Sequence, residues 1–540
     1  MLRIRSLGRV SFPEANDVQH SLLNAADDYL LLFEHPPTYT RGIRTTDQSF
    51  RRPVATSTAI VVDADRGGDV TFHGPGQLVA WYIRTVADDP SAGRHHVAML
   101  EDVITAAVLR VAAPGSLGDV GSMDGYPGVW AHRTTRPVKI AQVGVRTERD
   151  ARGRRRTLHG IAVNVSVDLA YFDEIVPCGI AEFPVGSLQS LGVAISDREF
   201  EDVVRDEFLQ RVSAASVAAV DHATASVTSE RPLIRRMRKA GVDLESALPV
   251  ATRKPEWLRL PAVMGEEYIR LRQMTSDLSL VTVCEEAGCP NIYECWADGT
   301  ATFMVNGERC TRNCGFCLVD TRKPLALDPS EPERVAEAVA RLQLAHAVVT
   351  CVARDDLDDG GAGAIANTIT AIRERCPDTH VEVLISDCRG DRRSQQIIFD
   401  ATPDVLNHNI ETVARLQRAV RPSAGYLRSL AVLARAKAEG LTTKSGMMVG
   451  LGETIDEVHE TLIDLAAVGV DIVTIGQYLR PTAQHLPVMR WWTPEEFESL
   501  AAFGRHVGIG TEGRHDAVVG HERAAAIRGR RFRGRAGVGS

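Results

Sequence analysis

The chain has 540 residues, enough for more than one domain and for full hydrophobic cores. Its formal net charge of −8 is small for this length, so composition indicates neither a nucleic-acid-binding nor a membrane-binding surface. The first residues lack the apolar segment of a secretory signal, and no apolar run approaches the length of a transmembrane helix. These features predict a cytoplasmic protein whose clustered cysteines serve metal binding or catalysis rather than disulfides, with Cys351, Cys376 and Cys388 as buried thiols.

The first predicted domain covers residues 1–212, where short β-rich runs alternate with loops and a few helical patterns. Because strands dominate this region, we expect a mixed α/β sheet rather than a barrel. The predicted strands are 29–35, 59–65, 77–83, 139–147 and 160–169.

Two features of this domain point to chemistry. The segment RGGDVTFHGPGQL (66–78) concentrates glycines around Arg66 and His73, and glycine lets a ligand approach the backbone amides closely. Cys178 lies between Pro177 and Gly179, and such a turn favours the surface over the core. The alternative interpretations are a pair of ordinary glycine turns and a buried cysteine that serves only packing.

Together these segments resemble the octanoyltransferases of lipoate biosynthesis, which are related to the biotin and lipoate ligase catalytic domains. The resemblance extends over nearly all of the first 212 residues through LLFEHPPTYTRG (31–42), VKIAQVGVR (138–146) and HGIAVNV (159–165). It implies transfer of octanoate, without ATP, from octanoyl-acyl carrier protein to lipoyl domains of 2-oxoacid dehydrogenase complexes and to the glycine cleavage H protein.

The resemblance also assigns residues to this transfer. Cys178 would carry the octanoyl thioester, and Lys139 would activate the thiolate and relay the proton of the acceptor amine. The residues that would line the acyl pocket are Arg66, Gly67, Gly68, Asp69, Val70, Thr71, Phe72, His73, Gln142, Val143, Gly144, Gly160, Ile161 and Ala162.

Residues 213–255 change character. They begin with a stretch rich in alanine and serine that shows no periodicity, which is typical of a linker. A basic cluster follows, and we interpret it as a solvated face of the same linker.

The second predicted domain covers residues 256–508. From about residue 327, helical patterns alternate with β-rich runs, which predicts parallel β/α units arranged as a partial barrel. Functional sites in such folds lie at the carboxyl ends of the strands. The predicted strands are 346–353, 380–386, 404–411, 442–452 and 471–479.

Two cysteine triplets precede these predicted β/α units, with spacings C-x4-C-x5-C and C-x3-C-x2-C. Three thiolates can hold an iron–sulfur cubane and leave its fourth iron open. A zinc knuckle is the alternative, but it needs a fourth ligand, and no C-x2-C pair follows. The triplets are Cys284, Cys289 and Cys295, then Cys310, Cys314 and Cys317.

The second triplet resembles that of the radical S-adenosylmethionine superfamily, and the first triplet narrows the resemblance to lipoyl synthase. The match continues in RDDLDDGGA (354–362), NHNIET (407–412), TKSGMMVGLGET (443–454) and GQYLRPTAQHLPV (476–488). It implies two 4Fe–4S clusters, S-adenosylmethionine and an electron donor protein. A 5′-deoxyadenosyl radical would remove hydrogen at C6 and C8 of a bound octanoyl chain. The cluster on Cys284, Cys289 and Cys295 would then supply the two sulfurs.

The chain departs from the lipoyl synthase pattern at its C-terminal end. Family members carry an Arg-Ser-Ser-Tyr-His stretch whose serine is the fourth ligand of the auxiliary cluster, whereas here the match fades after 491–508. We interpret residues 509–540 as a disordered tail from an altered reading frame, with a basic interaction tail as the alternative. Substitute ligands could come from His506, Glu512 or His515.

The leading hypothesis is therefore a bifunctional enzyme that performs octanoyl transfer and then sulfur insertion. One alternative is an active octanoyltransferase joined to a synthase half impaired by loss of the serine ligand. Another is a C-terminal half that acts only as a binding platform for octanoylated domains.

Overall fold

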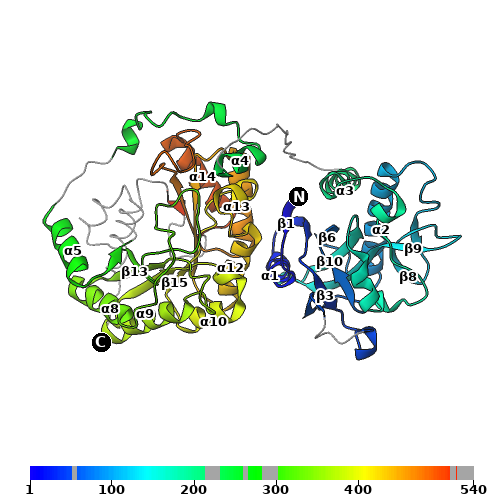
Figure 1. Ribbon diagram of the computed structural model, residues 1–540, viewed down its shortest axis with the longest axis horizontal. Coiled ribbons are helices and arrows are strands. Elements are labelled where there is room, and N and C mark those ends of the chain that lie inside the picture. Colours follow the sequence, from blue (N-terminus) through cyan, green and yellow to red (C-terminus); the bar gives the residue numbers. More distant parts are fainter. Residues whose placement is uncertain (52–56, 213–231, 260–264, 283–301, 511–517, 520–540) are drawn as a thin grey trace. The chain divides into compact units, whose positions relative to one another are not determined.

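The computed structural model describes residues 1–51, 57–212, 232–259, 265–282, 302–510 and 518–519. The chain divides into two compact units, Met1–Asp221 and His222–Ser540 (Figure 1). Both units are α/β, which confirms the predicted fold class. Among the described helices, none combines the length and apolarity that a bilayer crossing requires.

The first unit is built on a mixed sheet with the strand order β1-β2-β6-β10-β9-β8-β7. A smaller sheet, β4-β3-β5, accompanies it. The strands are β1 (Leu2–Arg9), β2 (Asp28–Glu34), β3 (Thr38–Arg41), β4 (Ile60–Asp63), β5 (Thr71–His73), β6 (Gln77–Ile83), β7 (Gly121–Met123), β8 (Tyr126–Ala131), β9 (Val138–Arg149) and β10 (Arg155–Asn164).

Side-chain alternation along β6 separates the core of this unit from its pocket. Leu78, Ala80 and Tyr82 join a hydrophobic core with residues of α2 (Ala92–Val111) and α3 (Asp197–Val212). Val79 and Trp81 point to the opposite face, as expected when successive strand residues alternate. Helix α1 (Phe12–Leu22) begins with a capping box of Ser11 and Glu14, and its Phe12 lies 5.6 Å from Trp81 between ring centroids.

All five strands predicted in this unit are present. The predicted strand 160–169 is too long, however, since β10 ends at Asn164. The chain turns there because the Asp168 side chain accepts a hydrogen bond from the Ala170 N–H and begins the 3-10 helix η3 (Leu169–Glu174).

The second unit contains one sheet with the order β11-β12-β13-β14-β15-β16-β17-β18, parallel from β12 onward. Its five predicted strands and the helix before each of them are confirmed, and Figure 1 shows these helices outside the curved sheet. The strands are β11 (Val281–Thr282), β12 (Thr302–Val305), β13 (His346–Cys351), β14 (His380–Leu384), β15 (Val405–Asn407), β16 (Thr443–Val449), β17 (Ile472–Gln477) and β18 (Val518–Val519). The helices are α4 (Pro232–Lys239), α5 (Glu266–Asp277), α8 (Glu331–Leu342), α9 (Ala362–Arg375), α10 (Arg392–Asp400), α11 (Gln417–Val420), α12 (Tyr426–Ala438), α13 (Ile455–Ala467) and α14 (Pro494–His506).

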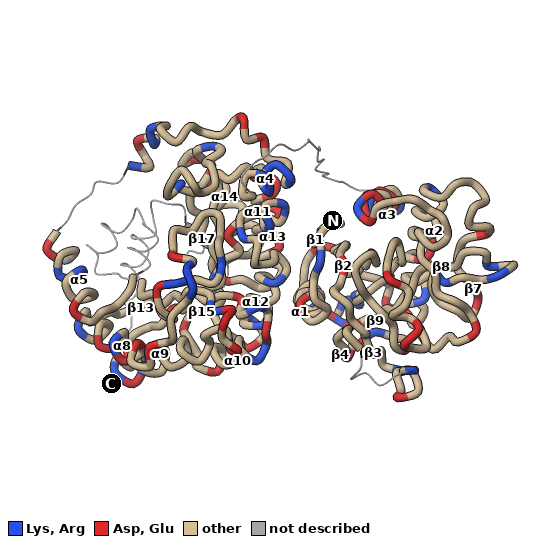
Figure 2. The backbone as a smooth tube through the Cα atoms, in the orientation of Figure 1, with Lys and Arg blue, Asp and Glu red and all other residues tan. Residues whose placement is uncertain are grey.

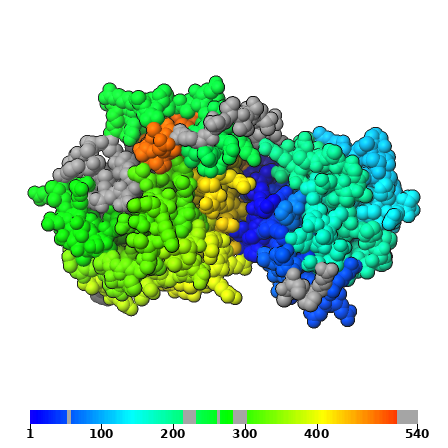
Figure 3. All heavy atoms as spheres, viewed as in Figure 1, coloured from blue at the N-terminus to red at the C-terminus, as the bar shows by residue number. Residues whose placement is uncertain are grey.

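The sequence predicts a linker over residues 213–255. From Pro232 onward the structure shows that this prediction is wrong. Helix α4 buries Met237 completely, and the Ala240 carbonyl accepts a 2.6 Å hydrogen bond from Arg415. The Leu248 N–H donates to the Val488 carbonyl, so this segment forms part of the outer layer of the second unit (Figure 3). Figure 2 shows the basic residues of α4. It also shows that acidic and basic residues are interspersed over each unit.

The interpretation of residues 509–540 as a disordered tail also needs correction in the part that the structure describes, residues 509–510 and 518–519. Ile509 is fully buried, and β18 pairs in parallel with β17 through Val518 and Val519. A two-residue strand has no period that a sequence pattern could reveal. The other residues of this segment from 511 onward, and Cys284, Cys289 and Cys295, lie outside the described residues.

Candidate active sites

Cys178 occupies a strained turn at the edge of a pocket in the first unit. It lies in the 3-10 turn η4 (Pro177–Gly179) and has a positive φ of 57°, followed by Gly179 at 75°. Such a backbone is uncommon for a residue with a side chain, so the neighbouring structure must hold it. The Cys178 N–H donates a 2.8 Å hydrogen bond to the Val70 carbonyl, which fixes the turn beside β5. The Cys178 side chain is half-buried.

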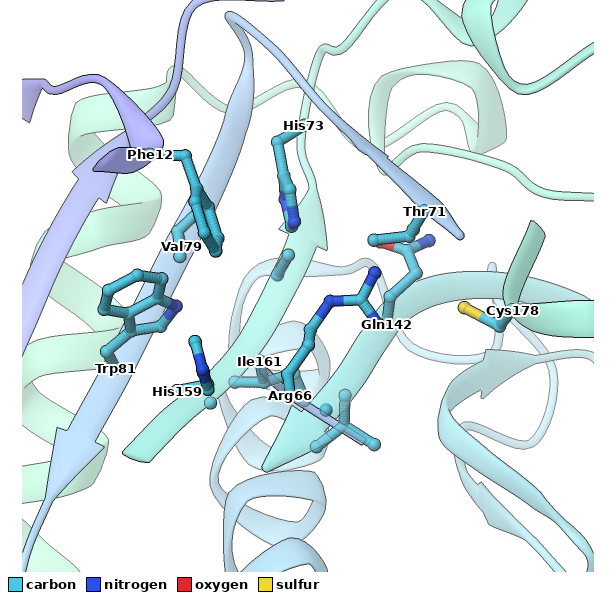
Figure 4. Close-up of a pocket in the computed structure, with 14 residues that line it drawn as sticks. Phe12, Arg66, Thr71, His73, Val79, Trp81, Gln142, His159, Ile161 and Cys178 are labelled. Atoms are coloured by element: carbon cyan, nitrogen blue, oxygen red, sulfur yellow. The ribbon is translucent and has the colours of Figure 1, made fainter. Parts of the chain in front are cut away.

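The pocket beside Cys178 brings together ten of the sixteen residues that the sequence predicted for the transfer site (Figure 4). They come from β5, β9, β10, η4 and the loop before β5. The ten are Arg66, Thr71, His73, Gln142, Val143, Gly144, Gly160, Ile161, Ala162 and Cys178.

Sequence reasoning missed four lining residues, which are Phe12, Val79, Trp81 and His159. Val79 and Trp81 could have been found from the alternation of β6, because they share a face with Gln77 of the glycine segment. Phe12 comes from a separate helix, and no local pattern connects it with the pocket.

Six predicted residues do not line this pocket, and five of them shape the loop around it. The Asp69 carboxylate accepts hydrogen bonds from the Ser49 hydroxyl at 2.7 Å and the Val70 N–H at 2.6 Å. Phe72 stacks on Tyr171 with ring centroids 4.3 Å apart. The six residues are Gly67, Gly68, Asp69, Val70, Phe72 and Lys139.

Lys139 is a buried cation on β9. Its residue is 2% exposed, and its Nζ lies 5.3 Å from the centre of the Trp130 ring. Its backbone contacts the chain that continues from Cys178, because its N–H donates to the Pro184 carbonyl and its carbonyl accepts from the Gly186 N–H. Within the described residues, we find no hydrogen bond to the Lys139 ammonium.

Arg66 brings a fixed positive charge to the Cys178 side of the pocket. Its guanidinium donates to the Thr40 carbonyl and hydroxyl, the Gly67 carbonyl and the Asp69 carbonyl, at 2.7–3.2 Å. Burial lowers the pKa of Arg66, while the negative charges of Cys178 and Asp69 act in the opposite direction. A guanidinium held this firmly stays charged at neutral pH.

The far wall of the pocket is aromatic and uncharged. Burial holds the pKa of His73 well below its usual range and lowers to about 4 that of His35, which packs against His73 without lining the pocket. Phe12 stacks over His73 and His159, at 6.5 and 6.1 Å between ring centroids. Neutral rings of this kind suit an apolar ligand chain better than a polar one.

The C-x3-C-x2-C segment of the second unit forms a loop between β12 and α8. The Cys310 N–H donates to the Asp320 carbonyl, and the Gly315 N–H donates to the Val420 carbonyl. Burial raises the pKa of Cys314 to about 12, with Arg421 opposing it and the charges of Cys317 and Cys310 adding to it.

The donor set of this loop fits an iron–sulfur cluster. The loop supplies three cysteines within eight residues, the number of protein ligands that an open-iron cubane takes. Among the described residues, no group of three or more His, Cys, Asp or Glu side chains is arranged to hold a single metal ion. A cluster of several irons separates its thiolates more widely than one ion does.

Arg312, within the same loop, is anchored by two carboxylates. Its Nε and Nη2 donate to Asp355 at 2.8 Å each, and its Nη2 donates to Asp387 at 2.5 Å. Burial alone would lower the pKa of Arg312, but the two carboxylates raise it overall. Asp355 and Asp387 follow β13 and β14, so this side chain ties the cysteine loop to the carboxyl ends of the sheet.

A parallel sheet with a C-x3-C-x2-C loop at the carboxyl ends of its strands defines a radical S-adenosylmethionine enzyme. The Radical SAM superfamily matches residues 304–465, and the family described as "Lipoyl protein ligase A/B catalytic domain" matches residues 14–209. The lipoyl synthase of Symbiobacterium thermophilum is 54% identical over 274 residues, which cover 49% of this chain and 86% of that protein. The lipoyl synthase of Mycobacterium tuberculosis is 50% identical over 268 residues, covering 50% and 86%. Through its C-terminal half, the chain belongs to the lipoyl synthase family.

Two solved structures match parts of the chain at low TM-scores. A bi-partite lipoate protein ligase from Thermoplasma acidophilum has a TM-score of 0.30 at 16% identity and covers 39% of this chain and 84% of its own. Streptococcus suis SuiB bound to S-adenosylmethionine has a TM-score of 0.33 at 13% identity and covers 47% and 60%.

The family matches confirm both resemblances found in the sequence. The chain joins a catalytic domain of the lipoate ligase and octanoyltransferase type to a radical SAM lipoyl synthase domain. It is a bifunctional enzyme of lipoate biosynthesis with acyltransferase and radical SAM sulfurtransferase activities. S-adenosylmethionine and 4Fe–4S clusters belong to that chemistry.

Proposed function

We propose that the first unit transfers an octanoyl group from octanoyl-acyl carrier protein to a lysine of lipoyl domains, and that Cys178 carries the group between them. The observation that supports this most directly is the position of Cys178 at a pocket with an aromatic, uncharged wall. A ligase that activates a free acid with ATP has no use for a cysteine at that position.

The proposed transfer balances without any redox partner. In the first half-reaction, the Cys178 sulfur forms a bond to the acyl carbon, the bond to the carrier thiol breaks, and that thiol gains the proton. In the second, the acceptor amine forms the C–N bond, and Cys178 leaves as the thiol. We assign to Lys139 the donation of a proton to each leaving thiolate and its recovery from the incoming thiol or amine; its backbone pairs with Pro184 and Gly186, in the chain that continues from Cys178. The acceptors would be lipoyl domains of 2-oxoacid dehydrogenase complexes and the glycine cleavage H protein.

The second unit would complete the lipoyl group. We assign Cys310, Cys314 and Cys317 to the cluster that binds S-adenosylmethionine, and the cysteines at 284, 289 and 295 to an auxiliary cluster. When bound, these groups supply a radical that removes hydrogen at C6 and C8, and the sulfur that replaces it. Arg312 holds the loop of Cys310, Cys314 and Cys317 in place. An electron donor protein would deliver the electrons. The limits 1–212 and 256–508 remain our assignment of the two catalytic domains, and we place both reactions in the cytoplasm.

Intact-mass spectrometry tests the first half of this proposal. The full chain, mixed with octanoyl-acyl carrier protein and no ATP, should gain one octanoyl group, and peptide mapping should locate it on Cys178. Adding a lipoyl domain should remove the group from Cys178 and transfer it to the acceptor lysine. If the chain instead octanoylates the acceptor only from free octanoate and ATP, it is a ligase and the proposal is wrong.

A further inference from the structure

Two buried polar atoms in the acyl pocket have no hydrogen-bond partner among the described residues. They are the hydroxyl of Thr71 and the amide nitrogen of Gln142. The two residues are 3% and 4% exposed, and both line the pocket that Cys178 lines. An unsatisfied buried donor costs about 1–3 kcal/mol, so a pair of them facing one cavity indicates a ligand that supplies an acceptor there.

The surrounding network fixes which end of Gln142 faces the cavity. The Asn164 amide nitrogen donates to the Gly186 carbonyl at 2.9 Å, so its oxygen faces Gln77. The Gln77 amide nitrogen donates to that oxygen, and at 3.1 Å to the Phe72 carbonyl. Gln142 therefore presents its oxygen to Gln77, at 3.5 Å, and directs its N–H groups away from it. Backbone carbonyls only accept, so they fix the amide orientations of Asn164 and Gln77. Both N–H groups of Gln77 are then used, and the Gln142 oxygen faces it because the reverse orientation would set two amide nitrogens against each other.

Thr71 is tied to the nucleophile through the backbone. The residue before it, Val70, accepts the Cys178 N–H, and Figure 4 shows Thr71 and Gln142 at the end of the pocket that carries Cys178. The turn itself offers no free amide for a carbonyl oxygen. Its N–H groups at 178, 179 and 180 donate to the carbonyls of Val70, Val176 and Pro177.

We propose that the Thr71 hydroxyl and the Gln142 amide together bind the carbonyl oxygen of the acyl group at Cys178. The inference rests on the proposed acyl transfer and deepens it. As the Cys178 sulfur adds to the acyl carbon, that oxygen gains negative charge, which the two donors stabilise. When the carbon–sulfur bond to the leaving thiol breaks, the oxygen returns to a carbonyl. The same pair acts again when the acceptor amine attacks.

The test compares two reactions of the same sulfur. Acylation of Cys178 by the N-acetylcysteamine thioester of octanoate passes through an oxyanion, whereas alkylation by iodoacetamide does not. Both rates are measured on the full chain by intact mass, for the parent, Thr71→Val and Gln142→Met. These replacements keep approximate size and remove the donor. Thr71→Ser, which restores a hydroxyl, tests for rescue.

Thr71→Val and Gln142→Met should each slow acylation by about 10²–10³-fold, the usual effect of losing one such donor. Alkylation should stay within about twofold, and Thr71→Ser should recover most of the acylation rate. The inference is overturned if acylation persists at the parent rate, or if alkylation falls as much as acylation. A parent chain that alkylates but never acylates would instead refute the acyl transfer itself.

Discussion

The pocket around Cys178 and the loop of Cys310, Cys314 and Cys317 differ in what each site needs besides the folded chain. The pocket draws its walls from α1, β5, β6, β9 and β10, and two of its polar atoms, Thr71 Oγ1 and Gln142 Nε2, are left without a partner among the described residues. In the cysteine loop, burial and the charges of the neighbouring cysteines raise the pKa of Cys314 to about 12, and binding a metal would require this thiol to lose its proton. Folding alone forms the pocket and leaves two donors for its ligand, whereas the cysteine loop is completed by its cofactor.

The largest effect is expected from replacing the nucleophile, which should impair the first site and leave the second unchanged. Cys178→Ser should abolish the octanoyl adduct and reduce acyl transfer by roughly 10³-fold or more, because the serine hydroxyl is not ionised at neutral pH. Iron loading of the second unit should match that of the parent after anaerobic reconstitution. Transfer that persists in Cys178→Ser would remove the acyl-cysteine from the mechanism.

The converse change concerns cofactor binding. Cys314→Ala should lower the iron content after reconstitution by about four atoms per chain, from about eight if both triplets hold 4Fe–4S clusters. Cys376→Ala, at the end of α9, is the matched control and should leave the count unchanged. Acylation of Cys178 should continue at the parent rate in both variants. A parent chain that binds only about four irons would indicate that the auxiliary cluster is missing.

A third prediction tests whether Lys139 relays protons while Cys178 acts as the nucleophile. Lys139→Ala should slow transfer to the acceptor lysine by about 10²-fold, since a proton relay typically contributes 10²–10⁴-fold. Iodoacetamide should still alkylate Cys178 when the measurement is made at high pH, because the sulfur is then ionised without help. Lys139 does not line the pocket, so an unchanged transfer rate would reduce it to a structural cation beside Trp130.

The anchoring of the cysteine loop gives a smaller effect. Arg312→Lys cannot reproduce the fork to Asp355 and the bond to Asp387, and breaking a buried pair of this kind costs about 3 kcal/mol of unfolding free energy. We expect a lower midpoint for thermal unfolding of the second unit and slower iron uptake. Arg322→Lys, an exposed residue of the same segment, should change neither. Equal behaviour of the two variants would show that the network does not position the loop.

The sequence predicted these sites unevenly, for physical reasons. Helix and strand periods identified the β/α units because each period repeats over many residues, and close cysteine spacing identified the loop because its ligands are local. Trp81 could have been predicted from the alternation of β6, whereas Phe12 comes from α1 and reaches the pocket only in the folded unit. Helix α4 was mistaken for linker because one buried residue, Met237, holds a short basic helix to the unit. Unpaired donors such as Gln142 Nε2 become visible only when every neighbouring hydrogen bond is known.

The smallest predicted effect concerns acid stability in the second unit. Glu382 of β14 lies buried and accepts hydrogen bonds from Lys444 Nζ at 2.8 and 3.1 Å, with His346 nearby. Burial alone would raise the pKa of Glu382, but His346 and Lys444 lower it to about 2. A glutamate in the unfolded chain titrates near pH 4.3, above the folded value. The ion pair therefore stabilises the fold above about pH 4.3, and that stabilisation is lost as the pH falls toward 2.

Glu382→Gln should consequently be less stable than the parent at pH 7, and the two should converge as the pH falls. Urea unfolding at several values between pH 3 and 7, with hydrogen exchange of the β14 peptide as the probe, measures this gap. Glu374→Gln, at an exposed position on α9, should follow the parent throughout. Titrating groups away from Glu382 are shared by the two chains, so closure of the gap below about pH 4.3 reports the loss of the Glu382 ion pairs. A gap of constant size from pH 7 to 3 would mean that Glu382 contributes as a hydrogen-bond acceptor and not through its charge.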